Sequence, residues 1–276
     1  MSLLITIVGL ILFVAIISYP ILILPHMIRR PDYAPFDNHL YAHRGLHNNK
    51  GYAPENSLKA FRLATEAGYG IELDIRLSKD KIPVVFHDDT LRRICGSEGR
   101  VEDYTCKELK RFVLCHSKET IPTLKEALDE VNGKVPIIIE YKIKGGDLSL
   151  CEEAEKILAT YPGPYCMESF NPLALRWFKK NNKAIVRGQL STDFLKEKNK
   201  GNRIMYWLLS RLLFNRIGKP DFIAYQYKYP HKASLAIVRD LYNLPTAAWT
   251  ITNQEDLEES KRYFRYIIFD SFIPKL

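Results

Sequence analysis

Short apolar runs alternate with amphipathic segments through most of the chain. Nine short runs are rich in β-branched and aromatic residues, and segments in which apolar residues recur with helical spacing separate most of them. The predicted strands are 39–42, 71–75, 83–86, 136–140, 165–169, 184–188, 221–225, 246–250 and 266–269. The predicted helices are 57–67, 105–112, 123–132, 148–160, 172–181, 203–217, 232–242 and 254–264.

Regular alternation of strands and helices is typical of a parallel sheet covered by helices. An open nucleotide-binding sheet would carry a G-x-G-x-x-G fingerprint or a P-loop after its first strand, and neither motif is present. A closed (β/α)8 barrel, or TIM barrel, takes about 250 residues, which is nearly all of this 276-residue chain. We therefore predict an α/β fold of the TIM-barrel type.

Two details do not fit an ideal barrel. There are nine predicted strands rather than eight, and the connection from Arg76 to Ile82 is too short for a crossover helix. One of the nine runs should therefore be a cap, an edge strand or no strand at all.

Residues 3–24 form an uncharged apolar run at the N-terminus. About 20 such residues suffice to cross a bilayer, and no basic segment or small-x-small cleavage site indicates a cleaved signal peptide. A buried core helix is the less favoured alternative, because no polar face interrupts the run. We expect a transmembrane anchor at 1–25, a juxtamembrane linker at 26–37 and the barrel at 38–276.

The basic residues beside this run predict its orientation. Arg29 and Arg30 follow it, whereas no lysine or arginine precedes it, so the positive-inside rule places the barrel in the cytoplasm. The chain has five cysteines and no C-x-x-C pair, which argues against a disulfide framework and against a zinc site. These cysteines are Cys95, Cys106, Cys115, Cys151 and Cys166.

The net charge of +8 favours an anionic partner. Nucleic acid, an acidic membrane surface and a phosphate substrate all satisfy this, although no surface module interleaving aromatic and basic residues indicates nucleic-acid binding. The segment 196–219 has six basic residues and no acidic one from Lys198 to Lys219, around the apolar stretch MYWLLSRLLF. It is either a membrane contact or a helix packed on the barrel, and both interpretations stay open.

Residues that carry chemistry are concentrated between His43 and Asp89. This stretch reads AHRG at 42–45, PENS at 54–57, ELDIRLSKD at 72–80 and PVVFHDD at 83–89. The charged residues fall at or just beyond strand ends, where a TIM barrel places its active site. Carboxylates for a metal, histidines for protons and arginine for phosphate together suit phosphodiester cleavage at a divalent cation.

The carboxylates predict the cation site. Glu72 and Asp74 lie two residues apart on one strand, so their side chains share a face, where they repel each other unless a cation lies between them. Glu140 adds a third carboxylate, and Lys142 lies on the same face of that strand. Three hard oxygen ligands favour Mg²⁺ or Ca²⁺ over zinc. The alternative is an ion-pair network, for example Glu72 with Arg44.

Two histidines end predicted strands and are candidate proton carriers. His43 and His87 titrate near neutrality when unperturbed, so the pair can act as base and acid across one phosphate. Arg44 offers a planar fork to phosphate oxygens, and Lys142 offers a point charge. Trp249 is either a wall of the substrate pocket or a core residue. The remaining histidines are predicted to be linker, surface or packing residues: His26, His39, His47, His116 and His231.

Three further carboxylates have open roles. Glu55 is a candidate supporting partner for the residues above, while Asp88 and Asp89 either orient His87 or cap the loop that follows it.

These motifs, in this order, resemble the glycerophosphodiester phosphodiesterase family. Beyond HRG, PENS, ELDIRLSKD and VVFHDDTL, the resemblance continues through most of 39–270, with VEDYTCKEL at 101–109, IPTLKEAL at 121–128, IIEYK at 138–142, SF at 169–170 and AWTITN at 248–253. It implies a TIM barrel with its site at the strand C-termini. It also implies that Glu72, Asp74 and Glu140 bind a divalent cation and that His43 and His87 are catalytic.

The chain departs from the family pattern at Tyr141, where the family often has isoleucine, and in two longer segments. Its last strand reads YFRYIIFDSFIP, which keeps Asp270 but lacks the usual glycines, and the insertion after the third strand is short, at Leu91–Thr120. We expect hydrolysis of glycerophosphodiesters to sn-glycerol 3-phosphate and an alcohol, with attack by water or by the glycerol 2-hydroxyl. Two alternatives are a lysophospholipase D acting on membrane lysophospholipids and a catalytically silent, membrane-anchored binding domain.

Overall fold

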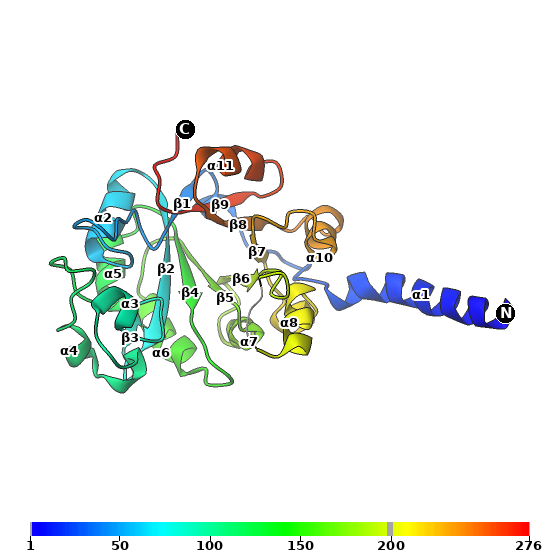
Figure 1. The fold of residues 1–276 in the computed structure, drawn as a ribbon, viewed down its shortest axis with the longest axis horizontal. Helices are drawn as coiled ribbons and strands as arrows, with labels where there is room; N and C mark the ends of the chain where they lie inside the picture. The colour runs from blue at the N-terminus through cyan, green and yellow to red at the C-terminus, as the bar shows by residue number, and fades with distance from the viewer. Residues whose placement is uncertain (1, 198–200, 276) are drawn as a thin grey trace.

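Eight parallel strands form a closed ring in the computed structural model of the protein, which describes residues 2–197 and 201–275 (Figure 1). Each strand pairs with the next along the chain, and β1 pairs with both β2 and β9 to close the ring. The predicted TIM barrel is confirmed. Its strands are β1 (Leu40–His43), β2 (Gly70–Leu77), β4 (Ile137–Tyr141), β5 (Tyr165–Ser169), β6 (Val186–Ser191), β7 (Phe222–Gln226), β8 (Thr246–Ile251) and β9 (Tyr266–Phe269).

The ninth predicted strand lies outside the ring. This strand, β3 (Pro83–Val85), pairs antiparallel with β2, so that Val84 lies opposite Arg76. The short connection before it is therefore a hairpin, which reverses the chain in a few residues and needs no crossover helix. The hairpin carries the chain back from the C-terminal end of β2 toward Asp74, and His87 comes two residues after the end of β3.

Helices cover the outside of the ring, and several begin at side-chain caps. Ser57 and Thr123 each accept a hydrogen bond from a backbone N–H in the first turn of the helix that follows. The larger helices are α2 (Leu58–Glu66), α5 (Leu124–Val131), α6 (Ser149–Leu158), α7 (Pro172–Asn181), α8 (Arg203–Ser210) and α11 (Gln254–Ser260). Shorter ones are η1 (Ala34–Phe36), α3 (Arg92–Cys95), η2 (Val101–Asp103), α4 (Cys106–Leu109), α9 (Asn215–Gly218), α10 (Ala233–Ala236) and the π-helical turn η3 (Ile237–Leu241).

Two predicted helices are interrupted. The helix predicted at 203–217 is divided into α8 and α9, because Leu212 between them is buried with a left-handed φ of 57°. The helix predicted at 232–242 begins as α10 and continues as the π-helical turn η3. The predicted helix 105–112 is shorter, with α4 alone at Cys106–Leu109.

Aromatic residues close the N-terminal end of the barrel interior. Phe36 of η1 packs with Tyr41, Phe222 and Tyr266 inside the ring. Gly188 on β6 makes room for this packing, since a Cβ there would lie 2.1 Å from Cζ of Phe222. A second, larger apolar layer lies between the strands and the outer helices. The C-terminal end is thus left for polar groups.

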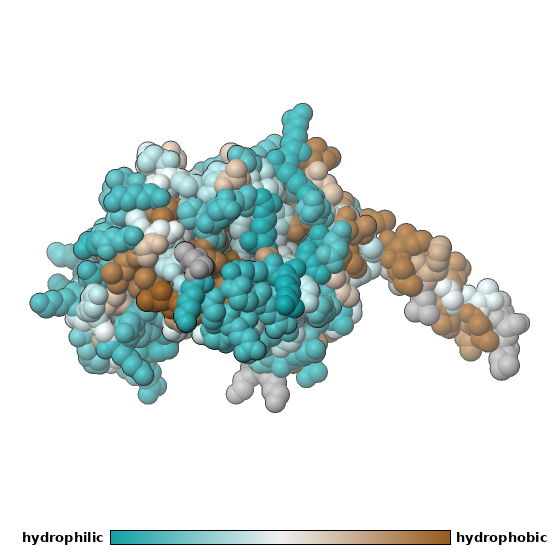
Figure 2. Space-filling model, turned by 90° about the horizontal axis from the view of Figure 1, so that it is seen from above, coloured by the Kyte–Doolittle hydropathy of each residue, from teal (hydrophilic) through white to brown (hydrophobic). Residues whose placement is uncertain are grey.

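An apolar helix, α1 (Ser2–Leu22), projects from the barrel (Figures 1 and 2). Its C-terminal end is attached to the barrel: Tyr19 Oη donates to the carbonyl of Arg211 at 3.0 Å, and Asn215 Nδ2 donates to the carbonyl of buried Ile23 at 3.0 Å. Among the residues that the structure describes, no helix was found with the length and apolar character required to cross a membrane. The transmembrane span predicted within 1–25 therefore stays a prediction.

Candidate functional site

Three carboxylates meet inside the C-terminal end of the barrel. Glu72 and Asp74 lie on β2, and Glu140 lies on β4 directly opposite Asp74. One oxygen of each lies within 4.8 Å of the others, and all three side chains are buried. The structure thus brings together the three residues predicted from the sequence to bind a metal.

Cations beside this cluster neutralise only part of its charge. Lys142 Nζ lies 2.9 Å from Asp74 Oδ1 and 2.7 Å from Glu140 Oε2. Burial and the neighbouring Asp74 raise the pKa of Glu72 well above its usual value, and burial raises the pKa of Glu140 to about 7 although Lys142 opposes it. Burial would also raise the pKa of Asp74, but Lys142 and Arg44 hold it well below its usual value.

This donor set fits a hard divalent cation. Three carboxylate groups converge on one small buried volume. Because the pKa values of Glu72 and Glu140 are raised, these two groups resist ionisation in the absence of further positive charge. Mg²⁺ and Ca²⁺ prefer oxygen ligands, and a bound cation favours the ionised form of its carboxylates.

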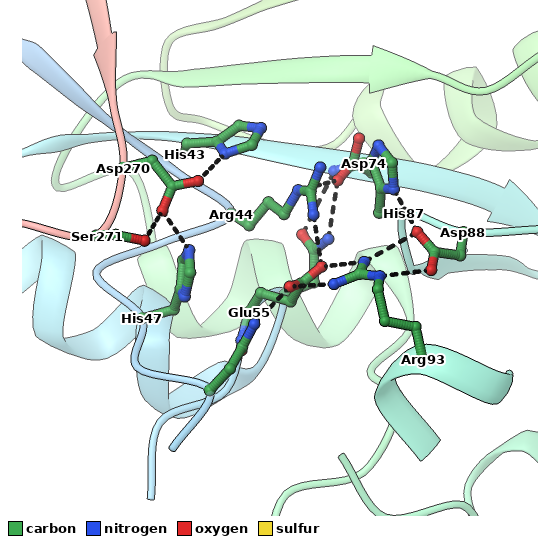
Figure 3. A network of polar contacts seen from close by, with 12 residues as sticks. His43, Arg44, His47, Glu55, Asp74, His87, Asp88, Arg93, Asp270 and Ser271 are labelled. Carbon is green, nitrogen blue, oxygen red and sulfur yellow. Dashed lines mark hydrogen bonds and ion pairs between the residues drawn. The ribbon is translucent and has the colours of Figure 1, made fainter. Parts of the chain in front are cut away.

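His43 stands beside the cluster at the end of β1. Its Nδ1 lies 2.7 Å from Asp270 Oδ2, and its Nε2 lies 3.9 Å from Glu72 Oε2. Burial lowers the pKa of His43 although Asp270 opposes this. Burial would raise the pKa of Asp270, but hydrogen bonds from His43 and His47 hold it well below its usual value. The imidazole is therefore fixed to Asp270 through Nδ1 (Figure 3), and its Nε2 is the ring nitrogen that lies near Glu72.

His47 lies beside this pair. The sequence pattern assigns it to packing or to the surface, whereas the structure places its Nε2 3.0 Å from Asp270 Oδ1. Asp270 thus contacts both histidines, and Ser271 Oγ also donates to its Oδ1 (Figure 3).

His87 has a carboxylate partner of its own. Its Nδ1 lies 2.6 Å from Asp88 Oδ1, and Arg93 Nε donates to Asp88 Oδ2 at 2.6 Å. Burial lowers the pKa of His87 to about 4, and the negative charge of Asp74 is the main influence that opposes this shift. Burial would raise the pKa of Asp88, but Arg93 and His87 lower it to about 2. Of the two roles left open for Asp88, the structure supports orienting His87.

Arginines and Glu55 connect the His87 side of the site to the carboxylates. Arg44 Nη1 donates to Glu55 Oε1 at 2.6 Å, and its Nε lies 3.3 Å from Asp74 Oδ2. Arg93 donates to both oxygens of Glu55, at 2.7 and 2.8 Å. A continuous set of ion pairs therefore runs from Asp88 through Arg93 and Glu55 to Arg44 (Figure 3).

The sequence left open an ion pair between the side chains of Glu72 and Arg44. In the structure, a hydrogen bond from the Arg44 backbone joins these two residues instead. The Arg44 N–H donates to Glu72 Oε2 at 3.1 Å, while the guanidinium turns to Glu55 and Asp74. Asp89 is the other carboxylate whose role the sequence left open. Its Oδ1 lies 2.5 Å from Arg76 Nη1, and among the described residues it makes no ion pair with His87. The structure thus places Asp89 in the hairpin's ion pairs.

Trp249 lies in the C-terminal half of β8 and packs against the apolar cluster inside the barrel. Its ring meets Phe170 edge to face, with centroids 5.7 Å apart. Within the described residues, its buried indole Nε1 has no hydrogen-bond partner. Trp249 therefore packs with one edge and leaves a donor for another group.

Sequence reasoning missed the contacts of four residues in this region: His47, Arg93, Glu168 and Asp270. Asp270 follows the last strand, and the family pattern indicates the residue but not its contact with His43. Glu168 precedes the SF motif on a predicted strand, where alternation gives it the same face as Cys166. Arg93 lies in the insertion, where nothing in the local pattern indicates that it reaches Glu55.

Known proteins share both the sequence and the fold. A Glycerophosphodiester phosphodiesterase from Bacillus altitudinis is 41% identical over 112 residues, which cover 38% of this chain and 44% of that protein. One from Caldanaerobacter subterraneus subsp. tengcongensis is 36% identical over 151 residues, covering 50% of this chain and 60% of that one. The chain spans about half the length of the curated relatives it matches.

Solved structures match over a longer range. A phosphodiesterase from Oleispira antarctica, in complex with the product sn-glycerol-3-phosphate, has a TM-score of 0.68 at 25% identity and covers 85% of this chain and 93% of its own. The glycerophosphodiester phosphodiesterase of Thermotoga maritima has a TM-score of 0.64 at 26% identity, and the match covers 84% of this chain and 94% of that one. The Glycerophosphoryl diester phosphodiesterase family matches residues 43–272, which include all the site residues described above. The chain therefore belongs to the glycerophosphoryl diester phosphodiesterase family.

Proposed function

We propose that the protein hydrolyses glycerophosphodiesters to sn-glycerol 3-phosphate and an alcohol, with Mg²⁺ or Ca²⁺ held by Glu72, Asp74 and Glu140. The observation that carries this proposal is the buried three-carboxylate cluster between two histidines, each fixed by its own carboxylate. The product complex of the similar Oleispira antarctica phosphodiesterase supports the choice of substrate.

The cation supplies Lewis-acid polarisation of the phosphate when it is bound. The histidines move the protons. One imidazole takes a proton from the attacking hydroxyl, and the other gives one to the leaving oxygen. Because Asp270 holds Nδ1 of His43 and Asp88 holds Nδ1 of His87, the Nε2 atoms are the ones that exchange protons with the substrate.

Arg44, Lys142 and Trp249 bind the substrate in this proposal. Arg44 and Lys142 place positive charge at the edge of the carboxylate cluster, where phosphate oxygens need it. The unpartnered indole N–H of Trp249 offers a donor to a substrate oxygen.

We further propose that residues 1–25 attach the enzyme to a membrane, that 26–37 form a linker and that the barrel, 38–276, lies in the cytoplasm. Helix α1 contains no charged residue, and many of its apolar side chains are exposed, among them Leu4, Leu10 and Ile16. Arg29 and Arg30 after it support the orientation.

A basic groove beside the end of α1 favours anionic lipid as the partner. It lies over α7 and α9, and α9 donates a hydrogen bond from Asn215 to the end of α1. Lys219 follows α9, and its pKa is lowered by burial and by the charges of Arg216 and Lys179. In the described part of the chain, no acidic residue lines this groove. Its lining residues are Arg176, Lys179, Lys180, Lys183, Arg216 and Ile217.

The exposed face of α8 favours a second candidate, a lysophospholipase D. Ile204 is 73% exposed and Trp207 is 43% exposed, with Arg211 stacked 4.3 Å from the Trp207 ring centroid. Such a face suits contact with a bilayer interface, from which a lysolipid would enter. Residues 198–200, part of the segment 196–219, lie outside the described residues.

A substrate panel tests both functions. The full chain, reconstituted in phosphatidylcholine vesicles, is incubated with glycerophosphocholine, glycerophosphoethanolamine, glycerophosphoglycerol and lysophosphatidylcholine, with and without EDTA. We expect release of sn-glycerol 3-phosphate that EDTA abolishes and Mg²⁺ or Ca²⁺ restores. Faster turnover of the lysolipid would favour the second function, and no turnover of any diester with either cation would exclude both.

A further inference from the structure

A fourth carboxylate, Glu168, lies inside the barrel next to Glu140. It belongs to β5, where its backbone is directly paired with Glu140 of β4. Cys166, two residues earlier, is part of the apolar cluster inside the ring, so strand alternation directs Glu168 to the same interior. The residue is only 1% exposed.

One oxygen of the buried Glu168 carboxyl group, Oε2, has no hydrogen-bond partner among the described residues. The neighbouring ammonium of Lys142 is already bound to Asp74 and Glu140. On the other side, β6 contributes Gly188, which has no side chain, with the Phe222 ring against it. A buried carboxyl group without a hydrogen bond is costly.

Glu168 is not positioned as a fourth ligand of the same cation. In the described part of the chain, the carboxylates with mutually close oxygens are Glu72, Asp74 and Glu140, and Glu168 is not one of them. It lies on the next strand beyond Glu140, directly opposite Glu140 in the strand register. A different hydrogen-bond donor must therefore satisfy it.

We propose that Glu168 accepts hydrogen bonds from the hydroxyl groups of the glycerol moiety, and thereby selects glycerophosphodiesters over diesters that lack a polyol. This inference rests on the proposed function. The alcohol part of the substrate, which varies in size, needs an open path to solvent. The small glycerol part is the one that can lie against the cluster, and its hydroxyls would supply the donor that Glu168 Oε2 lacks. A site built to bind a hydroxyl discriminates strongly against an analogue without it.

The test compares glycerophosphocholine with ethylphosphocholine, which lacks both glycerol hydroxyls. In Glu168→Leu the acceptor is removed, and kcat/KM for glycerophosphocholine should fall about 5-fold or more, the effect of losing a hydrogen bond. The value for ethylphosphocholine should change less than about twofold. Glu168→Gln, which keeps one acceptor oxygen, should be intermediate. Cys166→Ala, one layer deeper on the same strand, is the control and should keep the wild-type preference.

Calorimetry supplies a readout that does not depend on turnover. Glu168→Gln and Glu168→Leu should bind Mg²⁺ like the wild type but bind sn-glycerol 3-phosphate more weakly, with ethyl phosphate unaffected. Weaker Mg²⁺ binding would make Glu168 a metal ligand, and an equal loss for both substrates would make it structural; either result overturns the proposal. If the wild type cleaves neither diester, the proposed function itself fails.

Discussion

Each imidazole of the site is held by a carboxylate through Nδ1, but the two carboxylates come from different parts of the chain. His43 uses Asp270, which follows the last strand, whereas His87 uses its neighbour Asp88. A fixed Nδ1 sets the tautomer and the ring orientation, as it does for histidines in metal sites. Both side chains therefore have a defined Nε2, the atom that would exchange protons in the proposed mechanism.

Replacing either histidine by alanine should lower kcat about 10²-fold or more, because one proton transfer then lacks its carrier. A diester with a 4-nitrophenol leaving group needs no acid, so it should partly rescue whichever of His43→Ala and His87→Ala lacks the acid. Thermal unfolding serves as the folding control. Full turnover of glycerophosphocholine by His87→Ala would remove that residue from the mechanism.

The raised pKa of Glu140 predicts a pH-dependent stability. Its pKa is about 7 in the folded protein against 4.5 for the free group, so the folded state favours the protonated form. In EDTA, stability should therefore fall relative to Glu140→Gln as pH rises from about 4.5 to 7, and then level off.

The measurement is the melting temperature of both proteins between pH 4 and 8. Above pH 7 the Glu140→Gln variant should melt higher by on the order of 5 °C, and Mg²⁺ should reverse the order by stabilising the wild type alone. A difference that does not change with pH would show that Glu140 ionises freely.

At the residue scale, the sequence predicted the contacts and shared faces of residues that lie close together in the chain. Glu72 and Asp74 share a face because of strand periodicity, and His87 has its partner next to it in the chain. Asp270 is separated from His43 by 227 positions, so only closure of the ring by β1 and β9 brings them together. Neither His47 nor Arg93 carries a local signal for its contacts.

At the scale of elements, the hairpin of β2 and β3 and the helix α3 form one side of the site. The hairpin positions His87, and α3 supplies Arg93, which pairs with both Asp88 and Glu55. These elements interrupt the regular strand–helix alternation, which explains why the sequence pattern gave nine strands. The sequence also does not predict the break between α8 and α9 at Leu212, because a buried leucine in a left-handed conformation has no sequence signal.

Removing the Arg93 side chain tests this arrangement. Without Arg93, Asp88 should interact more strongly with protonated His87, so the pKa of His87 should rise from about 4 toward its usual 6.5. We expect Arg93→Met to lower kcat by about 10-fold and to move the acidic limb of the pH–rate profile to higher pH, with partial recovery in Arg93→Lys. Arg92→Met, at the exposed neighbouring position, is the control. An unchanged pH profile in Arg93→Met would contradict the positioning role.

At the scale of the whole molecule, different parts of the chain lie at the two ends of the barrel. The linker after α1 runs over the N-terminal ends of the strands, where His26 pairs with Asp221 at the start of β7. The carboxylates and histidines lie at the opposite, C-terminal end. The family could be predicted from sequence because its motifs lie at these strand ends. The placement of α1 against α9 could not, since it depends on contacts between Ile23 and residues almost 200 positions away.

The proposed orientation predicts the result of a C-terminal fusion. A reporter that works only outside the cytoplasm should give no signal when fused to the end of the full chain, because Arg29 and Arg30 keep this side in the cytoplasm. A cytoplasmic reporter on the same chain should be active. Changing Arg29 and Arg30 to glutamate, with lysines added before Leu4, should reverse both signals. A strong external signal from the unaltered chain would overturn the orientation.

The central claim is that one cation at Glu72, Asp74 and Glu140 enables diester hydrolysis. The most direct measurement follows Mg²⁺ binding and glycerophosphocholine hydrolysis together, in the metal-stripped wild type and in Glu72→Gln. The wild type should bind one ion per chain at this site and gain activity in proportion to its occupancy. Glu72→Gln should lose both while keeping its melting temperature in EDTA. Hydrolysis by Glu72→Gln at the wild-type rate in metal-stripped buffer would show that the reaction does not depend on this site.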